Sequence, residues 1–142
     1  MSSAGFWDDA EVISSYTRAD AIEDGTLVDV SEWASASKGF MGGFTVPVVM
    51  TRALWEVVDI EARPKSRRPL GQDTRGRAHD VLWMASLSLR SQLLRERQPG
   101  APLAPLYHAS FDVLLTNGRA KVAHLSLVLD GDGVTVGSPE DF

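Results

Sequence analysis

The sequence predicts one α+β domain over residues 1–142, a mostly antiparallel sheet with a C-terminal β-hairpin packed against one long helix. Apolar residues recur at helical spacing from 74 to 97, which predicts the long helix. Two alternating runs, 109–116 and 119–129, flank Asn117 and Gly118, a pair typical of a two-residue hairpin turn. The 142 residues, 44% hydrophobic and 23% charged, suit a single globular core.

The first ordered segment should be a short helix followed by a strand. Thr17 and Asp20 have the spacing of a capping box, and Gly25 can adopt the left-handed conformation that ends a helix. The run 26–30 is rich in β-forming residues. Ser31 is predicted to cap a second helix. We expect residues 1–11, which precede this segment, to form a flexible tail.

The next segment contains a connection, a strand and a helix. Residues 35–43 are rich in glycine and serine, and no lysine and hydroxyl follow in the arrangement of a phosphate-binding loop. Residues 44–50 read as a strand, and Pro47 should place it at a sheet edge or a bulge. Thr51 should cap the helix that follows. The buried face of that helix should consist of Leu54, Trp55 and Val58.

Three motifs resemble the signature of a family of small uncharacterised proteins, a domain of unknown function. They are YTRADAIEDGTLVDV at 16–30, GFTVPVVMT at 43–51 and GQDTRGRAHDVLWM at 71–84. The family is carried on bacterial plasmids, phages and integrated elements, so the resemblance implies an accessory gene of a mobile element and no established activity. The signature residues that could line a pocket are Tyr16, Arg18, Asp24, Asp29, Trp55, Gln72, Asp73, Asp80 and Trp83.

Basic residues concentrate between 63 and 77 in a chain whose net charge is −5. The segment is either a solvated loop or an anion-binding surface for a partner, which would also use a helix N-terminus near Asp73 or Thr74. The basic patch consists of Arg63, Lys65, Arg67, Arg68, Arg75 and Arg77.

The long helix should end where Pro99 and Gly100 stop it, and residues 98–106 should form a proline-rich connection. His79 and Asp80 lie in its first turns. As sequence neighbours they diverge by about 100° around the helix axis, so we expect no catalytic dyad.

The hairpin sequence predicts a register as well as a turn. With a two-residue turn, Thr116 lies opposite Arg119 and Phe111 opposite His124, with both of the latter facing the core. His124 is then an interior or rim histidine rather than a metal ligand. Residues 134–136 should add a third strand. If 119–129 or 134–136 is an exposed edge, two chains could pair there as a homodimer.

Several classes of function are disfavoured by residues that are missing. The chain has no cysteine, which excludes disulfides, thiolate metal sites and thiol nucleophiles. No carboxylates are spaced to converge, and no serine lies in a nucleophile-elbow motif. We therefore expect a non-enzymatic protein without cofactor or metal. Because no signal peptide and no apolar run of about 20 residues is present, we expect a soluble, cytoplasmic protein without a membrane partner.

Two kinds of function remain. The first is a non-enzymatic accessory binding protein of a mobile genetic element, an anti-CRISPR-like inhibitor of host defence that binds a host protein or nucleoprotein complex through the basic patch. The alternative is a protein that binds or sequesters a small molecule or nucleotide in a pocket beside the glycine-rich stretch. That pocket would be lined by Tyr16, Arg18, Asp24, Asp29 and Trp55. A hydrolase is the least favoured class.

Overall fold

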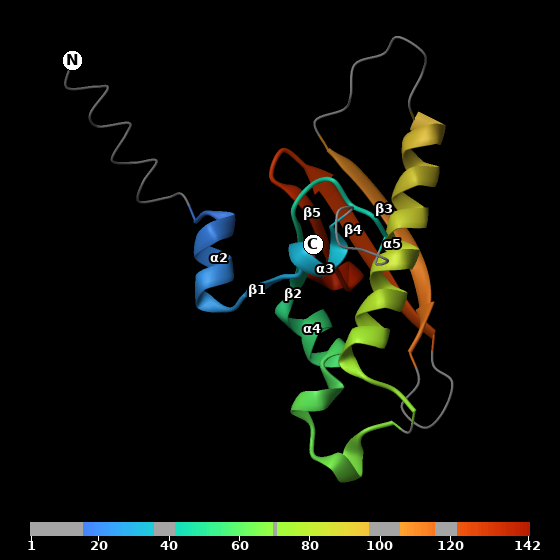
Figure 1. Ribbon diagram of the computed structural model, residues 1–142. Helices are drawn as coiled ribbons and strands as arrows, with labels where there is room; N and C mark the ends of the chain where they lie inside the picture. Colours follow the sequence, from blue (N-terminus) through green and yellow to red (C-terminus); the bar gives the residue numbers. More distant parts are fainter. Residues whose placement is uncertain (1–15, 36–41, 70, 97–105, 116–121) are drawn as a thin grey trace, which may run out of the picture.

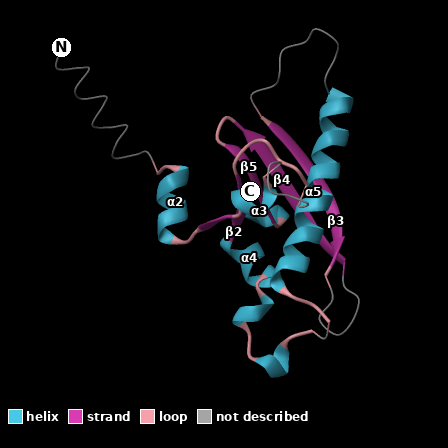
Figure 2. Ribbon diagram, viewed as in Figure 1, coloured by secondary structure: helices cyan, strands magenta, loops and turns pink. Residues whose placement is uncertain are grey.

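The computed structural model describes residues 16–35, 42–69, 71–96, 106–115 and 122–142, which form one α+β domain (Figure 1). Five strands make a sheet in the order β1-β2-β5-β4-β3 (Figure 2). Their bounds are β1 Leu27–Asp29, β2 Val48–Thr51, β3 Tyr107–Leu114, β4 Val122–Asp130 and β5 Gly133–Gly137. Among the described strands of this sheet only β2 and β5 pair in parallel, so the predicted mostly antiparallel sheet is confirmed. The predicted tail 1–11 and residues 98–105 of the connection lie outside the described residues.

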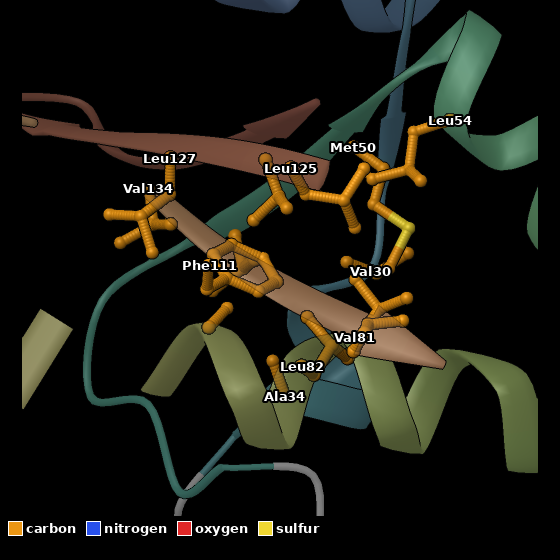
Figure 3. Close-up of a cluster of buried hydrophobic side chains, with 14 of the residues drawn as sticks. Val30, Ala34, Met50, Leu54, Val81, Leu82, Phe111, Leu125, Leu127 and Val134 are labelled. Carbon is orange, nitrogen blue, oxygen red and sulfur yellow. The ribbon is translucent and has the colours of Figure 1, made fainter. Parts of the chain in front are cut away.

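The longest helix, α5, spans Thr74–Glu96 and packs against β3 (Figure 1). The other helices are α2 Arg18–Asp24, α3 Ser31–Ala34 and α4 Arg52–Val58, with 3-10 turns η1 Ile60–Ala62, η2 Lys65–Arg67 and η3 Pro139–Asp141. Apolar side chains of α5, such as Val81 and Leu82, meet those of the sheet, such as Phe111 and Leu127 (Figure 3). The predicted core helix is thus confirmed.

The predicted cap and end of α2 are both confirmed. The hydroxyl of Thr17 accepts a hydrogen bond from the Asp20 N–H, and the Asp20 carboxylate accepts one from the Thr17 N–H. Gly25 ends the helix with φ 86°. β1 follows directly, because the left-handed glycine reverses the chain.

Ser31 does not cap α3, so that prediction is wrong. The N-cap position belongs to Val30, whose side chain makes no capping hydrogen bond. The Ser31 hydroxyl instead accepts a hydrogen bond from the Val48 N–H at 2.9 Å and donates one to the Val48 carbonyl at 3.2 Å. It therefore joins the start of α3 to the start of β2, a partner 17 residues away that local sequence does not reveal.

Pro47 marks neither an edge strand nor a bulge within β2. The strand begins one residue later and lies between β1 and β5, inside the sheet. Because Pro47 precedes the strand, its missing N–H removes no ladder hydrogen bond. Its carbonyl accepts a hydrogen bond from the Val134 N–H at 2.8 Å. The predicted cap at Thr51 is confirmed, since its hydroxyl accepts from the Leu54 N–H at 3.3 Å.

The hairpin pairs β3 with β4 as predicted, but the predicted register is wrong by one residue. Phe111 lies opposite Leu125, and Asp112 lies opposite His124. The observed register buries Phe111 and Leu125 together, whereas the predicted one would have turned His124 into the core. His124 is instead exposed, with Nδ1 2.5 Å from Asp112 Oδ1. The predicted turn at 117–118 lies outside the described residues.

Neither strand predicted to be a free edge is one. β4 lies between β3 and β5, and β5 lies between β2 and β4, because β5 also pairs in parallel with β2. Within the described part of the chain, the sheet ends at β1 and β3. Homodimer formation through a sheet edge remains a prediction, and those two strands are where it would occur.

Candidate functional site

The basic segment folds back against the start of α5. The Thr74 hydroxyl donates to Asp59 Oδ1 and accepts from the Glu61 N–H, both at 3.1 Å. Asp73 Oδ1 accepts from the Gly76 N–H at 2.6 Å, so Asp73 caps α5 as its sequence position predicts. These contacts hold η1 beside the N-terminus of the long helix.

Arg77 is the buried member of the predicted basic patch, with only 2% of its surface exposed. Its guanidinium donates to Gln72 Oε1 and to the Val57 carbonyl, both at 2.8 Å. Burial and the neighbouring positive charge of Arg63 lower the pKa of Arg77, and Asp80 acts in the opposite direction. Arg77 thus joins α5 to the end of α4 and is not available to a partner in the folded protein.

Two further arginines of the patch bind backbone carbonyls of the same segment. Arg63 donates to the Val57 carbonyl at 3.3 Å. Arg68 donates to the Arg63 carbonyl at 2.9 Å and to the Glu61 carbonyl at 2.7 Å. Charged donors to backbone carbonyls stabilise a segment that has little regular secondary structure of its own. These two side chains therefore have a structural role.

The remaining three basic residues, Lys65, Arg67 and Arg75, are exposed, and their side chains make no hydrogen bond or ion pair with any described residue. Lys65 and Arg67 belong to η2, and Arg75 to the first turn of α5. We call these three residues the basic surface. An α-helix N-terminus favours anions, so this end of α5 adds to the positive potential.

The signature residues around α2 bind one another and the sheet. Arg18 donates to the Val134 carbonyl at 2.7 Å and to the Thr135 hydroxyl at 2.9 Å, which fastens α2 to β5. Tyr16 donates a hydrogen bond to the Asp24 carboxylate. Asp24 also accepts from the Thr26 N–H at 2.9 Å. Three predicted pocket residues, Tyr16, Arg18 and Asp24, therefore have identifiable structural contacts.

The Tyr16 hydroxyl lowers the pKa of Asp24, with smaller contributions from Thr26. The hydrogen bond favours the charged carboxylate, so its stabilisation is present above the ordinary carboxyl pKa and is lost as pH falls through the lowered value. In Tyr16→Phe, a carbon-detected NMR titration should find the Asp24 pKa higher than in the wild type. An unchanged Asp24 pKa would contradict this assignment.

A hollow of about 400 Å³ lies next to this helix. Hydroxyl groups of Thr26, Thr51 and Thr135 line it together with the Arg52 side chain. Thr51 is already bonded to Asp141 at 2.8 Å, Thr135 to Arg18 at 2.9 Å and Thr26 to the Tyr16 hydroxyl at 3.4 Å, so all three hydroxyls have partners inside the protein. Of the residues predicted for the small-molecule pocket, none lines this hollow.

A second hollow, of about 420 Å³, lies at the N-terminus of α5. Gln72, Asp73, His79 and Asp80 line it beside Arg77. His79 Nδ1 lies 3.5 Å from Asp80 Oδ1. His79 stacks on Trp83 at a centroid distance of 6.2 Å, and Trp83 remains 44% exposed. These side chains form a polar surface, with no serine or cysteine among the lining residues to act as a nucleophile.

A third hollow brings together two signature residues, Asp29 and Trp55, with Trp33. The Trp33 and Trp55 ring centroids are 6.2 Å apart and their planes are tilted by 49°. Trp33 was not identified as a site residue from the sequence, because its neighbour Trp55 is 22 positions away and no local pattern connects the two. The signal in the sequence that could have suggested Trp33 is the acidic residue Asp29 at the end of a strand, with a tryptophan four positions later.

The described residues contain no group of three or more histidine, aspartate or glutamate side chains arranged to hold a metal ion. None of the helices in the described ranges is both long and apolar enough to cross a membrane.

Comparison with known proteins places the chain in a family. The model of a family described as a family of unknown function, DUF6573, matches residues 3–93. No curated protein and no solved structure matches the chain.

Proposed function

Because the chain belongs to DUF6573, a family of unknown function, we propose a role from its own surface: a non-enzymatic binding protein for an anionic face of a partner. The observation that carries this proposal is the basic surface of Lys65, Arg67 and Arg75, exposed and without internal partners among the described residues. In a chain of net charge −5, exposed cations on η2 and in the first turn of α5 favour a specific anionic contact over general binding to nucleic acid.

The biological setting that we propose follows the family signature. The protein would be an accessory product of a mobile genetic element, acting in the cytoplasm on a host protein or nucleoprotein complex of the defence machinery. The structural arginines support this role indirectly: Arg63, Arg68 and Arg77 hold the segment in one conformation. A preorganised segment loses less conformational entropy on binding than a mobile one.

Charge reversal at Arg67 should reduce partner binding by about fivefold or more, because a cation that faces an anionic surface becomes a repelling anion. The measurement is affinity capture from host lysate with wild type and Arg67→Glu, with and without nuclease. Retention that survives nuclease identifies a protein partner, and retention lost with nuclease identifies nucleic acid in the complex. Binding should also weaken steeply as salt rises.

Arg95→Glu is the matched control, since Arg95 is an exposed arginine near the other end of α5 that donates a hydrogen bond to the neighbouring Gln92 side chain. It changes the net charge equally and should leave capture intact. Arg68 is unsuitable for reversal, because its loss would free two backbone carbonyls. Equal retention by Arg67→Glu, Arg95→Glu and wild type would refute the basic surface as the binding site.

A further inference from the structure

We propose that the hollow between Trp33 and Trp55 binds a lysine or arginine side chain of a partner polypeptide. The hollow, which we call the Trp notch, measures about 180 Å³. Its lining residues are Val28, Asp29, Val30, Glu32, Trp33 and Trp55. This inference is independent of the basic surface, which carries the opposite charge.

The two indole rings give the Trp notch its chemistry. The ring centroids of Trp33 and Trp55 lie 6.2 Å apart with their planes tilted by 49°, and both residues line the notch. The face of a tryptophan ring attracts a cation more strongly than that of any other side chain. Both rings are half-buried and pack against the core, so they are held in place before a ligand arrives.

The charge of the lining residues favours a cation as well. Asp29 and Glu32 are exposed carboxylate residues, and none of the described residues that line the notch is a lysine or arginine. Asp29 Oδ1 accepts a hydrogen bond from the Ser31 N–H at 2.9 Å, which fixes that carboxylate at the end of β1. An anionic ligand would face the carboxylates of Asp29 and Glu32. Nucleic acid and phosphate are therefore disfavoured in the Trp notch.

The size of the hollow indicates a side chain rather than a whole small molecule. Pockets for drug-sized ligands occupy roughly 300–1,000 Å³. The Trp notch, at about 180 Å³, suits the end of one long side chain.

An extended peptide has a place to pair beside the notch. Arg52 N–H donates to the Thr26 carbonyl and Val30 N–H to the Val48 carbonyl, so alternate residues of β1 face β2. The backbone groups of Leu27 and Asp29 then point to the outer edge of β1, where no described strand pairs. A partner strand added there could place a basic side chain against the two rings, by the edge-pairing used in many peptide complexes.

The test uses capped five-residue peptides containing threonine, valine, a central residue, valine and threonine. The central residue is lysine, arginine or norleucine, which matches lysine in length but has no charge. Binding is followed through the indole N–H signals of the tryptophans in nitrogen-15 NMR spectra of the full chain. The lysine and arginine peptides should shift the Trp33 and Trp55 signals and bind about fivefold or more tightly than the norleucine peptide.

Matched variants distinguish binding at the Trp notch from binding at other exposed aromatic side chains. Trp55→Leu should abolish the shifts, and Trp83→Leu, which removes an exposed tryptophan on α5, should retain them. Glu32→Gln removes charge without removing a ring, and should weaken lysine-peptide binding about threefold. Asp132→Asn, in the β4–β5 turn, removes one charge elsewhere and should have no effect.

Three results would overturn the proposal. One is equal binding of the lysine and norleucine peptides, and another is the absence of any Trp33 or Trp55 shift with about 1 mM peptide. The third is tetramethylammonium ion binding as tightly as the lysine peptide, which would make the notch a site for small cations rather than for a polypeptide. Glu32→Gln keeps the test decisive even if Trp55→Leu does not fold.

Discussion

Replacing Gly133 with alanine is expected to lower the free energy of unfolding by about 4 kcal/mol, through strain and steric overlap acting together. Gly133 begins β5 with φ 121°, a backbone conformation that residues with a Cβ rarely adopt. A Cβ there would lie 2.3 Å from the Pro47 carbonyl oxygen. The overlap is with backbone, so no rotation of a side chain can relieve it.

The overlap with Pro47 lies at a point of the sheet where it should lower the free energy of unfolding further. The same Pro47 carbonyl accepts the Val134 N–H at 2.8 Å, at the start of the parallel β2–β5 pairing. That pairing joins segments more than 80 residues apart and is where the hairpin strands meet the N-terminal strands. A shift of Gly133 would therefore weaken the join between the two parts of the sheet.

The measurement is urea unfolding followed by tryptophan fluorescence, with a midpoint shift of about 2 M for a loss of 4 kcal/mol. Gly131→Ala is the control. Gly131 lies in the same turn, has no positive φ, and a Cβ there would meet nothing within 4 Å. It should change stability by no more than about 1 kcal/mol. Equal midpoints for Gly131→Ala and Gly133→Ala would show that the close approach to Pro47 does not constrain the fold.

Leu82→Ala is expected to cost about 3 kcal/mol of unfolding free energy. Leu82 is fully buried on the face of α5 that meets the sheet (Figure 3). Truncating it removes apolar contacts and leaves a cavity that the surrounding strands can fill only in part.

Leu94→Ala supplies the matched comparison, because it makes the same change on the same helix at a residue that is 81% exposed. Helix propensity changes little and equally in both variants, so the difference between them isolates burial. We expect Leu94→Ala to lie within about 0.5 kcal/mol of the wild type in the same urea experiment. If both variants lost stability equally, α5 would not pack through the face that contains Leu82.

The basic surface and the Trp notch would give this small domain two recognition sites of opposite charge. The first consists of residues of η2 and the first turn of α5. The second consists of residues from β1, α3 and α4. Their variants are independent, so Arg67→Glu and Glu32→Gln together can tell a single bipartite partner from two separate ligands.

The sequence by itself determined the elements that depend on near neighbours. The capping box of Thr17, the glycine end at Gly25, the cap at Thr51 and the start of α5 after Asp73 each involve groups within a few positions of one another. The helical period of α5 and the alternation in β3 likewise need only local counting. These were therefore predictable without knowledge of the fold.

Tertiary structure alone decided the hairpin register, the position of β5 in the strand order and which arginines of the basic patch have a structural role. The register shifted by one residue because burying Leu125 opposite Phe111 leaves His124 in water. Arg77 became a structural residue because the carbonyl of Val57, 20 positions away, lies beside it. The pairing of Trp33 with Trp55 likewise depends on how α3 and α4 pack. Contacts between distant segments form only when the whole chain buries its core, so no local pattern can specify them.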